Sequence, residues 1–406
     1  MRWRILIARN QKAAEHPRRC LRALSGAAIF LLLVAVCAAG NGFAEDQSRE
    51  NALALEQQGK NTEAETAWRS YLEAHPASSE AYAHLGLLEA RQERYGEAVP
   101  LYRKAIALQP SIPGLRLNLG LAYFKSGQMK QALEEFAPLL KAAPQSSPDR
   151  DRLTILVGMC HYGMGQYTAA VPYLKTASEL DPQNLQLLLA LAHSYLWSKQ
   201  YQNVMDVYRQ ILTLNAESAE ADMLAGEALD ELKDLPGAIE QFRAAVKADP
   251  TMPEVHFGLG YLLYTQRRYA EAAPELQAEI DNNPGHAQAL TYLADIDMQL
   301  DHPDAAVPLL QKAIGADPEI ELAHLDLGII DAAAGNNESA LREMKTAEKL
   351  APGDVNVHWR LGRFYRSTGN QQAAAAELEK ARTLTQAADT KLIDKMNPGA
   401  QKRQPQ

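Results

Sequence analysis

Hydrophobic and polar residues along the chain recur with a spacing of 34 residues, and prolines mark the period. The step from Pro144 to Pro182 is four residues longer, through the polar stretch 145–152, and the step to Pro250 spans two periods, with Ala216 at the intervening place. A period of this length predicts a chain built from repeated structural units. The prolines that mark it are Pro76, Pro110, Pro144, Pro182, Pro250, Pro284, Pro318 and Pro352.

Small and large residues keep fixed places within each period. We number each proline as position 32 of its repeat, so that Ser79 is position 1 of the second repeat. Position 8 is then Gly or Ala in all ten repeats, position 20 is Ala in all but one, which has Val204, and position 24 is always large. Small residues at positions 8 and 20 predict two antiparallel helices in close contact, with the residue at position 24 filling the space beside them.

Glycine and proline mark where these helices are expected to end. Gly127, Gly165, Gly335 and Gly369 fall near position 15, between the two predicted helices. A left-handed turn residue at that point ends a helix at little steric cost. Proline at position 32 ends the second helix, because it has no backbone N–H to donate inside a helix.

This arrangement resembles the tetratricopeptide repeat family, over about ten repeats in residues 45–388, with Val204 and Ala216 as departures in the fifth. The resemblance implies an all-α fold, a right-handed superhelical solenoid of helix-turn-helix repeats with a concave face. The four extra residues near 145–152 are expected to be an insertion. Residues 389–406, with Leu392, Ile393 and Met396, are expected to form a short capping segment and a disordered tail.

The first 44 residues differ from the rest of the chain. A basic stretch, residues 2–22, precedes an uncharged run from Gly26 to Ala39. This run is short for a membrane span, which needs about 20 apolar residues. It predicts a secretory signal peptide over residues 1–44, cleaved after Ala44, and hence a periplasmic or secreted protein. The alternative is an uncleaved N-terminal anchor from about residue 23 to residue 40.

Charge and cysteine content narrow the choice of partners. Once the seven bases and one acid of residues 1–44 are set aside, 34 bases and 49 acids remain, a net charge of −15. A body this acidic is not expected to bind nucleic acid. Contact with a membrane is expected only through an uncleaved leader. Cys160 is the one cysteine after residue 44, so the body has no intramolecular disulfide.

The sequence offers no catalytic motif. It contains no phosphate-binding Gly-x-x-x-x-Gly-Lys loop, no His-Glu-x-x-His and no Cys-x-x-Cys. The repeats leave no room for a separate catalytic domain. We therefore predict a non-catalytic protein without cofactor or metal. His256, His324 and His358 share position 4, and we expect them to be partly buried structural residues, with no carboxylate recurring in step with them.

The candidate site is a stripe on the first helix of each repeat, made of positions 2, 5, 9, 12 and 13. These positions share one side of a helix, and the family resemblance implies that they line the concave face. The stripe is apolar and aromatic, with an acidic portion in the sixth repeat, where a solvated face would be polar. The residues that we predict to line this partner-binding groove are Leu117, Leu121, Phe124, Ile155, Met159, Tyr162, Leu189, Trp197, Glu227, Asp230, Phe257, Tyr261 and Tyr264.

The resemblance and the groove together predict a scaffold or adaptor of the cell envelope. Its partners would be other proteins, held by a peptide or an amphipathic helix. Chaperone-binding members of the family clamp a carboxylate with Lys at position 5 and Asn at position 9. Here Leu117 and Leu121 hold such positions, so this clamp is absent. Two alternatives remain open: a self-associating structural component, or an accessory subunit of an envelope polysaccharide or secretion machinery.

Overall fold

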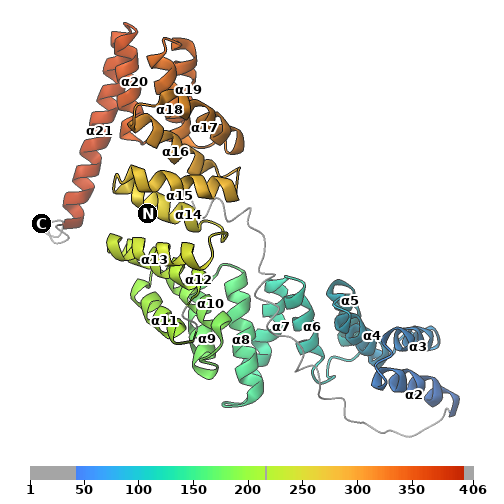
Figure 1. Cartoon of the computed structure of the whole chain (residues 1–406). Helices are drawn as coiled ribbons and strands as arrows, with labels where there is room; N and C mark the ends of the chain where they lie inside the picture. Colours follow the sequence, from blue (N-terminus) through green and yellow to red (C-terminus); the bar gives the residue numbers. More distant parts are fainter. Residues whose placement is uncertain (1–42, 215–216, 397–406) are drawn as a thin grey trace, which may run out of the picture. The chain divides into compact units, whose positions relative to one another are not determined.

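The computed structural model describes residues 43–214 and 217–396, which form twenty α-helices and no strand (Figure 1). The chain divides into two compact units, residues 1–232 and 233–406, each of which we describe by itself. Unit 1 contains α2 (Phe43–Gln57), α3 (Asn61–Ala74), α4 (Ser79–Arg91), α5 (Tyr95–Leu108), α6 (Leu115–Lys125), α7 (Met129–Ala142), α8 (Pro148–Gly163), α9 (Tyr167–Leu180), α10 (Leu185–Trp197), α11 (Tyr201–Leu214) and α12 (Ala219–Glu231). Unit 2 contains α13 (Leu235–Ala248), α14 (Val255–Thr265), α15 (Tyr269–Asn282), α16 (Ala287–Gln299), α17 (Pro303–Ala316), α18 (Glu321–Ala333), α19 (Asn337–Leu350), α20 (Val355–Ser367) and α21 (Gln371–Met396).

Each unit is a row of helices in which neighbours along the chain pack together. In unit 1 every helix from α2 to α12 contacts the next, and the same holds from α13 to α21 in unit 2. The first helix of a repeat also contacts the first helix of the next repeat, as α14 does with α16 and α16 with α18. The predicted all-α solenoid of helix-turn-helix repeats is therefore confirmed.

Glycine at position 8 lies directly under the large side chain of position 24. A Cβ added to Gly120 would come within 2.5 Å of the Phe136 ring, and one added to Gly362 within 2.7 Å of Leu378. Phe136 is fully buried. The large residue therefore lies against the backbone of the first helix, which is a closer contact than the filling of adjacent space that the sequence predicts.

The turn inside every repeat uses a left-handed residue at position 15. The four glycines singled out in the sequence have φ between +69° and +84° there. Five repeats place a residue with a side chain at the same position, and Lys199, for example, has φ +60°. Non-glycine residues adopt this conformation only at a cost, so the packing of the two helices determines the turn more strongly than its composition does.

Several predicted boundaries can be placed on the structure. The extra residues near 145–152 lengthen the start of α8, which begins at Pro148 with Ser147 as its N-cap. α21 runs without a break to Met396, so residues 389–396 continue the last helix rather than starting a new one. The predicted leader lies outside the described residues except for Phe43 and Ala44, which begin α2, and residues 397–406 also lie outside. No helix in the described ranges combines the length and the apolar character that a membrane crossing requires.

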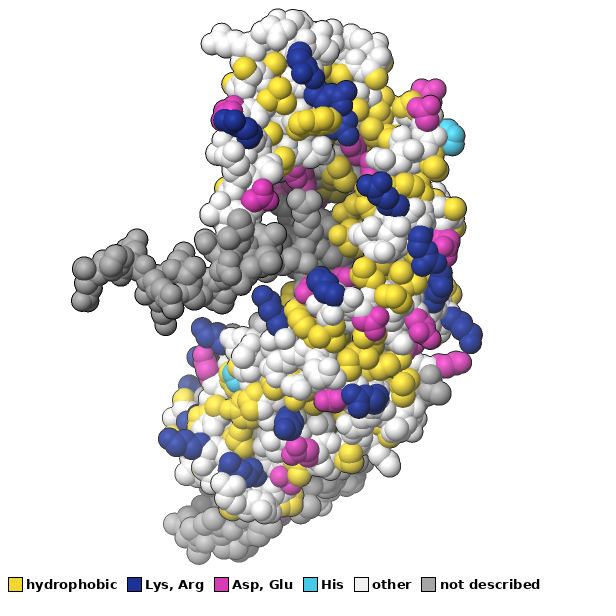
Figure 2. Space-filling model, turned by 90° about the vertical axis from the view of Figure 1, so that its left-hand side faces the viewer, with side chains coloured by type: hydrophobic (Ala, Val, Ile, Leu, Met, Phe, Trp, Pro, Cys, Tyr) yellow, Lys and Arg dark blue, Asp and Glu magenta, His cyan; other side chains and the backbone are white. Residues whose placement is uncertain are grey.

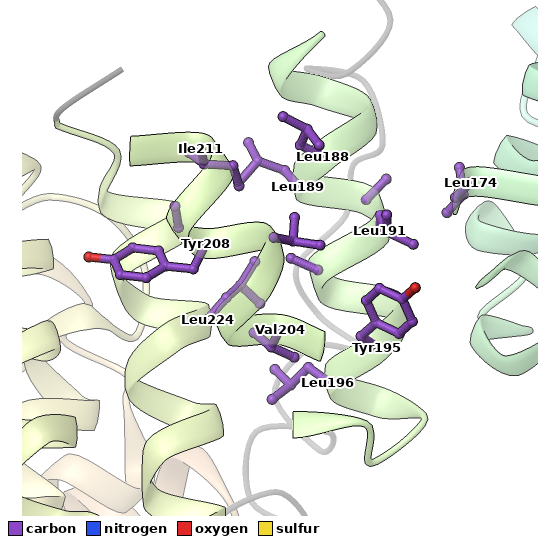
Figure 3. Close-up of a cluster of buried hydrophobic side chains, with 14 of the residues drawn as sticks. Leu174, Leu188, Leu189, Leu191, Tyr195, Leu196, Val204, Tyr208, Ile211 and Leu224 are labelled. Carbon is purple, nitrogen blue, oxygen red and sulfur yellow. The ribbon is translucent and has the colours of Figure 1, made fainter. Parts of the chain in front are cut away.

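The hydrophobic core is continuous across consecutive hairpins. In unit 1, Leu188 and Leu191 of α10, Ile211 of α11 and Leu224 of α12 belong to one buried cluster (Figure 3). Val204, the exception to alanine at position 20, is fully buried in the same cluster. The fifth repeat, which departs most from the sequence pattern, is thus packed like the others.

A polar pair links the two helices of several hairpins, and the sequence interpretation missed it. Each histidine at position 4 faces a glutamate at position 23, nineteen residues later, so our expectation that no carboxylate recurs in step with the histidines was wrong. Arg116 and Glu135 form the same pair, and Leu290 and Leu309 occupy the same two positions in the eighth repeat. The histidine pairs are His256–Glu275, His324–Glu343 and His358–Glu377, with N···O distances of 2.6–2.7 Å.

These histidines are accounted for by structure. His324 is buried, and its second ring nitrogen lies 3.1 Å from the carbonyl oxygen of Pro318. His358 makes the corresponding contact with Pro352. Both ring nitrogens of His324 and of His358 therefore lie against an oxygen atom of the same repeat, so the fold already uses both polar atoms of each ring.

The contact at position 8 can be tested with Gly120→Ala. We expect a loss of about 1–3 kcal/mol in the free energy of unfolding, because the new methyl group must displace the Phe136 ring from a closely packed core. Gly96→Ala is the control in the same unit, since a Cβ there meets nothing within 4 Å. Urea unfolding followed by circular dichroism measures both variants. Equal midpoints would show that the close contact is not needed.

The pair at positions 4 and 23 can be tested with a double-mutant cycle. His324→Leu alone should destabilise the protein by about 1–3 kcal/mol, because it leaves the Glu343 carboxylate without its histidine partner. Adding Glu343→Leu should recover most of that loss, since leucines hold both positions in the eighth repeat. Unfolding by urea again supplies the free energies, and a double variant less stable than the single variant would contradict the pairing.

Candidate functional site

The predicted groove residues divide into two groups by exposure. Phe124, Leu189, Glu227 and Phe257 are 7% exposed or less, so neighbouring helices cover them and they belong to the core. For these four, the expectation of a direct partner contact does not fit the structure. The remaining predicted residues are half-buried and keep a part of their side chains at the surface: Leu117, Leu121, Ile155, Met159, Tyr162, Trp197, Asp230, Tyr261 and Tyr264.

Stacking of first helices covers part of the stripe. Position 5 of one repeat contacts position 2 of the next, as the Arg49–Glu80 ion pair shows at 2.6 Å. Position 9 contacts position 6 of the next repeat, and position 12 contacts position 9. The examples are Tyr261 with Tyr292, ring centroids 5.3 Å apart, Tyr162 with His193 at 5.6 Å, and the hydrogen bond from Tyr264 to Asp295. The first helix of the next repeat therefore covers the side of each stripe that faces it and leaves the opposite side accessible.

In unit 1 the accessible part is an aromatic surface formed by α8, α9 and α10, which we call the Trp197 cluster. Tyr167 stacks on Trp197 with ring centroids 5.7 Å apart, and His193 lies 5.2 Å from Tyr167. The Trp197 indole N–H donates to Nε2 of His193 at 3.1 Å. Tyr162 completes the cluster from α8. The rings pack against one another, so they form a rigid aromatic surface rather than an open cage.

In unit 2 the corresponding surface lies on α14 and α16, and we call it the Tyr264 cluster. The Tyr292 ring centroid lies 5.3 Å from that of Tyr261 and 4.9 Å from that of Tyr264, and Tyr269 of α15 contacts Tyr264. The Tyr264 hydroxyl donates to the buried carboxylate of Asp295. Burial, together with this carboxylate, raises the pKa of Tyr264 above its ordinary value, so the phenol remains a donor. The sequence predicted Tyr261 and Tyr264, but not their partners.

A buried carboxylate lies behind this surface, on α18. Asp326 is 4% exposed, and its Oδ2 atom meets no hydrogen-bond donor among the described residues. Burial raises the pKa of Asp326 well above its usual range, the nearby Asp295 carboxylate raises it further, and Arg360 opposes them. The group therefore favours the neutral carboxyl form in the folded protein.

α20, the first helix of the tenth repeat, presents a different surface. We call it the α20 patch, and it consists of Trp359, Arg363 and Arg366. Trp359 is 41% exposed, and the Arg363 guanidinium lies 4.7 Å from its ring centroid. Arg363 and Arg366 are exposed and form no ion pair within the described part of the chain. Figure 2 shows Lys and Arg side chains grouped beside hydrophobic ones at its upper end, the end that α18 to α21 occupy in Figure 1.

Within the described ranges, two groups of acidic residues and histidine are close enough to suggest a metal site, and hydrogen bonding accounts for the first. His286 accepts the backbone N–H of Ala289 at Nδ1, and its Nε2 faces Glu254 at 3.1 Å. Glu279 accepts the backbone N–H groups of Glu254 and Phe257. A neutral imidazole has one lone pair, and here that lone pair caps α16. The group therefore fixes the starts of α14 and α16.

Lysines neutralise the second group, which consists of Glu348, His358 and Glu377. Lys345 lies 2.6 Å from Glu348, and Lys380 lies 3.1 Å from both carboxylates. Although burial by itself would raise it, the pKa of Glu377 is lowered, because hydrogen bonds from His358 and Lys380 favour the carboxylate. This charge network joins α19, α20 and α21, and its carboxylates already have cationic partners.

Cys160 is fully buried in unit 1. Burial raises the pKa of its thiol to about 12. Because the thiolate is the nucleophilic form, this cysteine is an inert packing residue at neutral pH.

The raised pKa of Asp326 predicts a pH-dependent effect of Asp326→Asn. Ionised Asp326 is disfavoured by folding, so its penalty is absent below the unfolded pKa, near 4, and grows as the pH rises. The variant should therefore be more stable than the wild type at pH 7, by about 1 kcal/mol or more, with the advantage disappearing towards pH 4. Unfolding curves across this range measure it. Asp389→Asn, at an exposed position, is the control, and an identical pH dependence in both variants would exclude this protonation state.

Two of the solved structures similar to this chain are described as tetratricopeptide proteins. One from Parabacteroides merdae is 16% identical, with a TM-score of 0.46, over 66% of this chain and 97% of that chain. Another, YrrB, described as a tetratricopeptide protein with an unusual peptide-binding site, is 20% identical, with a TM-score of 0.37, over 44% of this chain and 91% of that chain.

Two curated proteins illustrate the similarity in sequence. The BBSome complex member BBS4 of Mus musculus is 27% identical over 244 residues, which are 50% of this chain and 46% of that protein. Anaphase-promoting complex subunit 3 of Schizosaccharomyces pombe is 25% identical over 209 residues, 48% of this chain and 29% of that protein. The chain spans less than half the length of each.

Family models match most of the repeat region. A tetratricopeptide repeat model matches residues 49–113, 257–321 and 325–389, a second one matches residues 89–153 and 161–227, and a TPR repeat model matches residues 226–266. Together these ranges overlap every helix from α2 to α21. The chain belongs to the tetratricopeptide repeat family.

Proposed function

We propose that this protein is a non-catalytic adaptor of the cell envelope that holds partner proteins on the aromatic surfaces of its first helices. The observation that carries this proposal is the pair of half-buried aromatic clusters, the Trp197 cluster in unit 1 and the Tyr264 cluster in unit 2. Aromatic side chains bury a large area at a small cost in conformational entropy, and they commonly dominate binding at protein interfaces.

The rigidity of these clusters supports binding. Each ring in the Trp197 cluster is held by at least one ring of a neighbouring helix, and Trp197 is also hydrogen-bonded to His193. A surface that is ordered before binding loses little side-chain entropy when a partner docks. The partner would contribute a peptide or an amphipathic helix with apolar side chains facing the rings.

The character of the relatives supports an adaptor role. BBSome complex member BBS4 and anaphase-promoting complex subunit 3 are each components of a larger assembly by their names. Two kinds of residue in this chain could suggest a catalytic or metal site: the position-4 histidines and the two acidic groups. Both make contacts that hold the helices together. Binding is therefore the activity that its geometry supports best.

The envelope location rests on the sequence of residues 1–44. Its basic start, apolar run and small residues before the acidic Glu45 are the features of a secretory signal. Export would place the repeats outside the cytoplasm, where the partners would be other envelope proteins. Recovery of the protein in the cytoplasmic fraction of its own cells would contradict this part of the proposal.

Removal of the aromatic surface should weaken partner capture. The immobilised chain is used to capture proteins from an envelope extract, and the affinity of each purified partner is then measured. Trp197→Ala or Tyr261→Ala should weaken binding by about 2 kcal/mol or more, because aromatic anchors carry much of an interface energy. Leu180→Ala is the matched control, since this exposed leucine lies on a second helix. Unchanged affinity in both aromatic variants would exclude the two clusters as the binding surface.

A further inference from the structure

The α20 patch lies where the structure places a further helix in every preceding repeat of unit 2. Position 5 of α14, α16 and α18 is buried by the stacking of the next first helix, with Phe257, Thr291 and Leu325 at most 2% exposed. Position 5 of α20 is Trp359, which is 41% exposed. The flank of α20 thus has the form of a stacking surface, but no described helix covers it.

The contacts between earlier repeats specify what an incoming helix would present. Positions 5, 9 and 12 of a first helix face positions 2, 6 and 9 of the helix stacked on it, as Arg49–Glu80, Tyr261–Tyr292 and Tyr264–Asp295 show. A helix docked on α20 in the same way would face Trp359, Arg363 and Arg366 with three residues spaced i, i+4 and i+7. These three residues lie on one side of a helix.

The charge of the α20 patch indicates which side chains a docked helix would present to it. Arg363 and Arg366 carry no ion-pair partner in the described structure, although the chain after residue 44 has an excess of acids. At the first such interface of the chain, the Arg49 guanidinium is paired with the Glu80 carboxylate of the next helix. The same complementarity at α20 calls for carboxylates opposite the two arginines and an apolar side chain on the Trp359 ring.

We propose that the α20 patch binds an acidic amphipathic helix of a partner protein, which stacks on α20 as the first helix of an additional repeat would. Its contact residues are an apolar side chain at i, over Trp359, and Asp or Glu at i+4 and i+7, opposite Arg363 and Arg366. This inference rests on the proposed adaptor function and adds a second, chemically distinct surface to it.

The described helix that follows α20 does not cover this patch. α21 continues straight to Met396 and does not turn back to stack on α20. The ten residues that follow contain Lys402 and Arg403 and no acid, so they offer no side-chain carboxylate to the two arginines. A partner chain with the stated pattern has the complementary charge.

The test uses the full chain and synthetic helical probes. The first probe is a fluorescein-labelled, Ala-rich peptide with Leu at one position and Glu four and seven residues later. The second probe has Gln in place of both Glu residues, and the third has Lys. Fluorescence anisotropy at low salt should show that the Glu probe binds about tenfold more tightly than the Gln probe, and that added salt reduces this difference.

Variants of the chain then locate the site. Arg363→Gln with Arg366→Gln should abolish the preference for the Glu probe, and Trp359→Ala should weaken all three probes. Arg363→Glu with Arg366→Glu should transfer the preference to the Lys probe. The matched control is Lys312→Gln with Arg382→Gln, which removes the same charge at exposed positions on second helices. Thermal unfolding checks that each variant remains folded.

Three outcomes would overturn this inference. The Glu and Gln probes could bind equally to the wild type, or the preference could survive the arginine substitutions. Alternatively, light scattering could show concentration-dependent self-association that Arg363→Gln with Arg366→Gln abolishes, in which case a second copy of this chain occupies the patch. Trp197→Ala and Tyr261→Ala leave the α20 patch intact, so failure of the aromatic groove and failure of this patch would be seen separately.

Discussion

The contact between the small residue at position 8 and the large side chain at position 24 is the constraint on which the rest of each hairpin depends. Phe136 lies so close to Gly120 that no Cβ fits between them. This contact fixes the distance between the two helices, because dispersion and burial are lost steeply when a gap opens. The pairing of positions 4 and 23 and the strained turn at position 15 both follow from that distance.

Stacking of one hairpin on the next determines which residues are left for partners. In unit 2 the residue at position 5 of α14, α16 and α18 enters the core because the following first helix lies over it, whereas Tyr261 and Tyr264, at positions 9 and 12 of α14, are covered on one side only. The same sequence stripe therefore contains core residues such as Phe257 and surface residues such as Tyr261. α20 carries no such cover among the described residues, so its Trp359 is exposed where position 5 of the preceding first helices of unit 2 is buried.

Most of the charged groups described above hold helices of this protein together, and few are left to contact a partner. Lys345 and Lys380 neutralise two carboxylates where three helices meet, and His358 lies within hydrogen-bond distance of one of them. His324 joins two helices through its contact with Glu343. From residue type alone, these groups would suggest a catalytic or a metal site. Their contacts show that each already has a partner within the fold. Arg363 and Arg366 are different, since both are exposed and neither has a carboxylate partner in the described residues.

The sequence by itself determined the period, the class of fold and the role of its small residues, because Gly and Ala at fixed intervals have few physical explanations besides close helix packing. It also identified the stripe from which Tyr261, Tyr264 and Trp197 come. Only the tertiary structure decided which members of that stripe are accessible, since burial depends on the neighbouring repeat and not on the helix itself. The same reason applies to the carboxylate partners of the histidines: they lie nineteen residues away in sequence and meet only once the hairpin has folded.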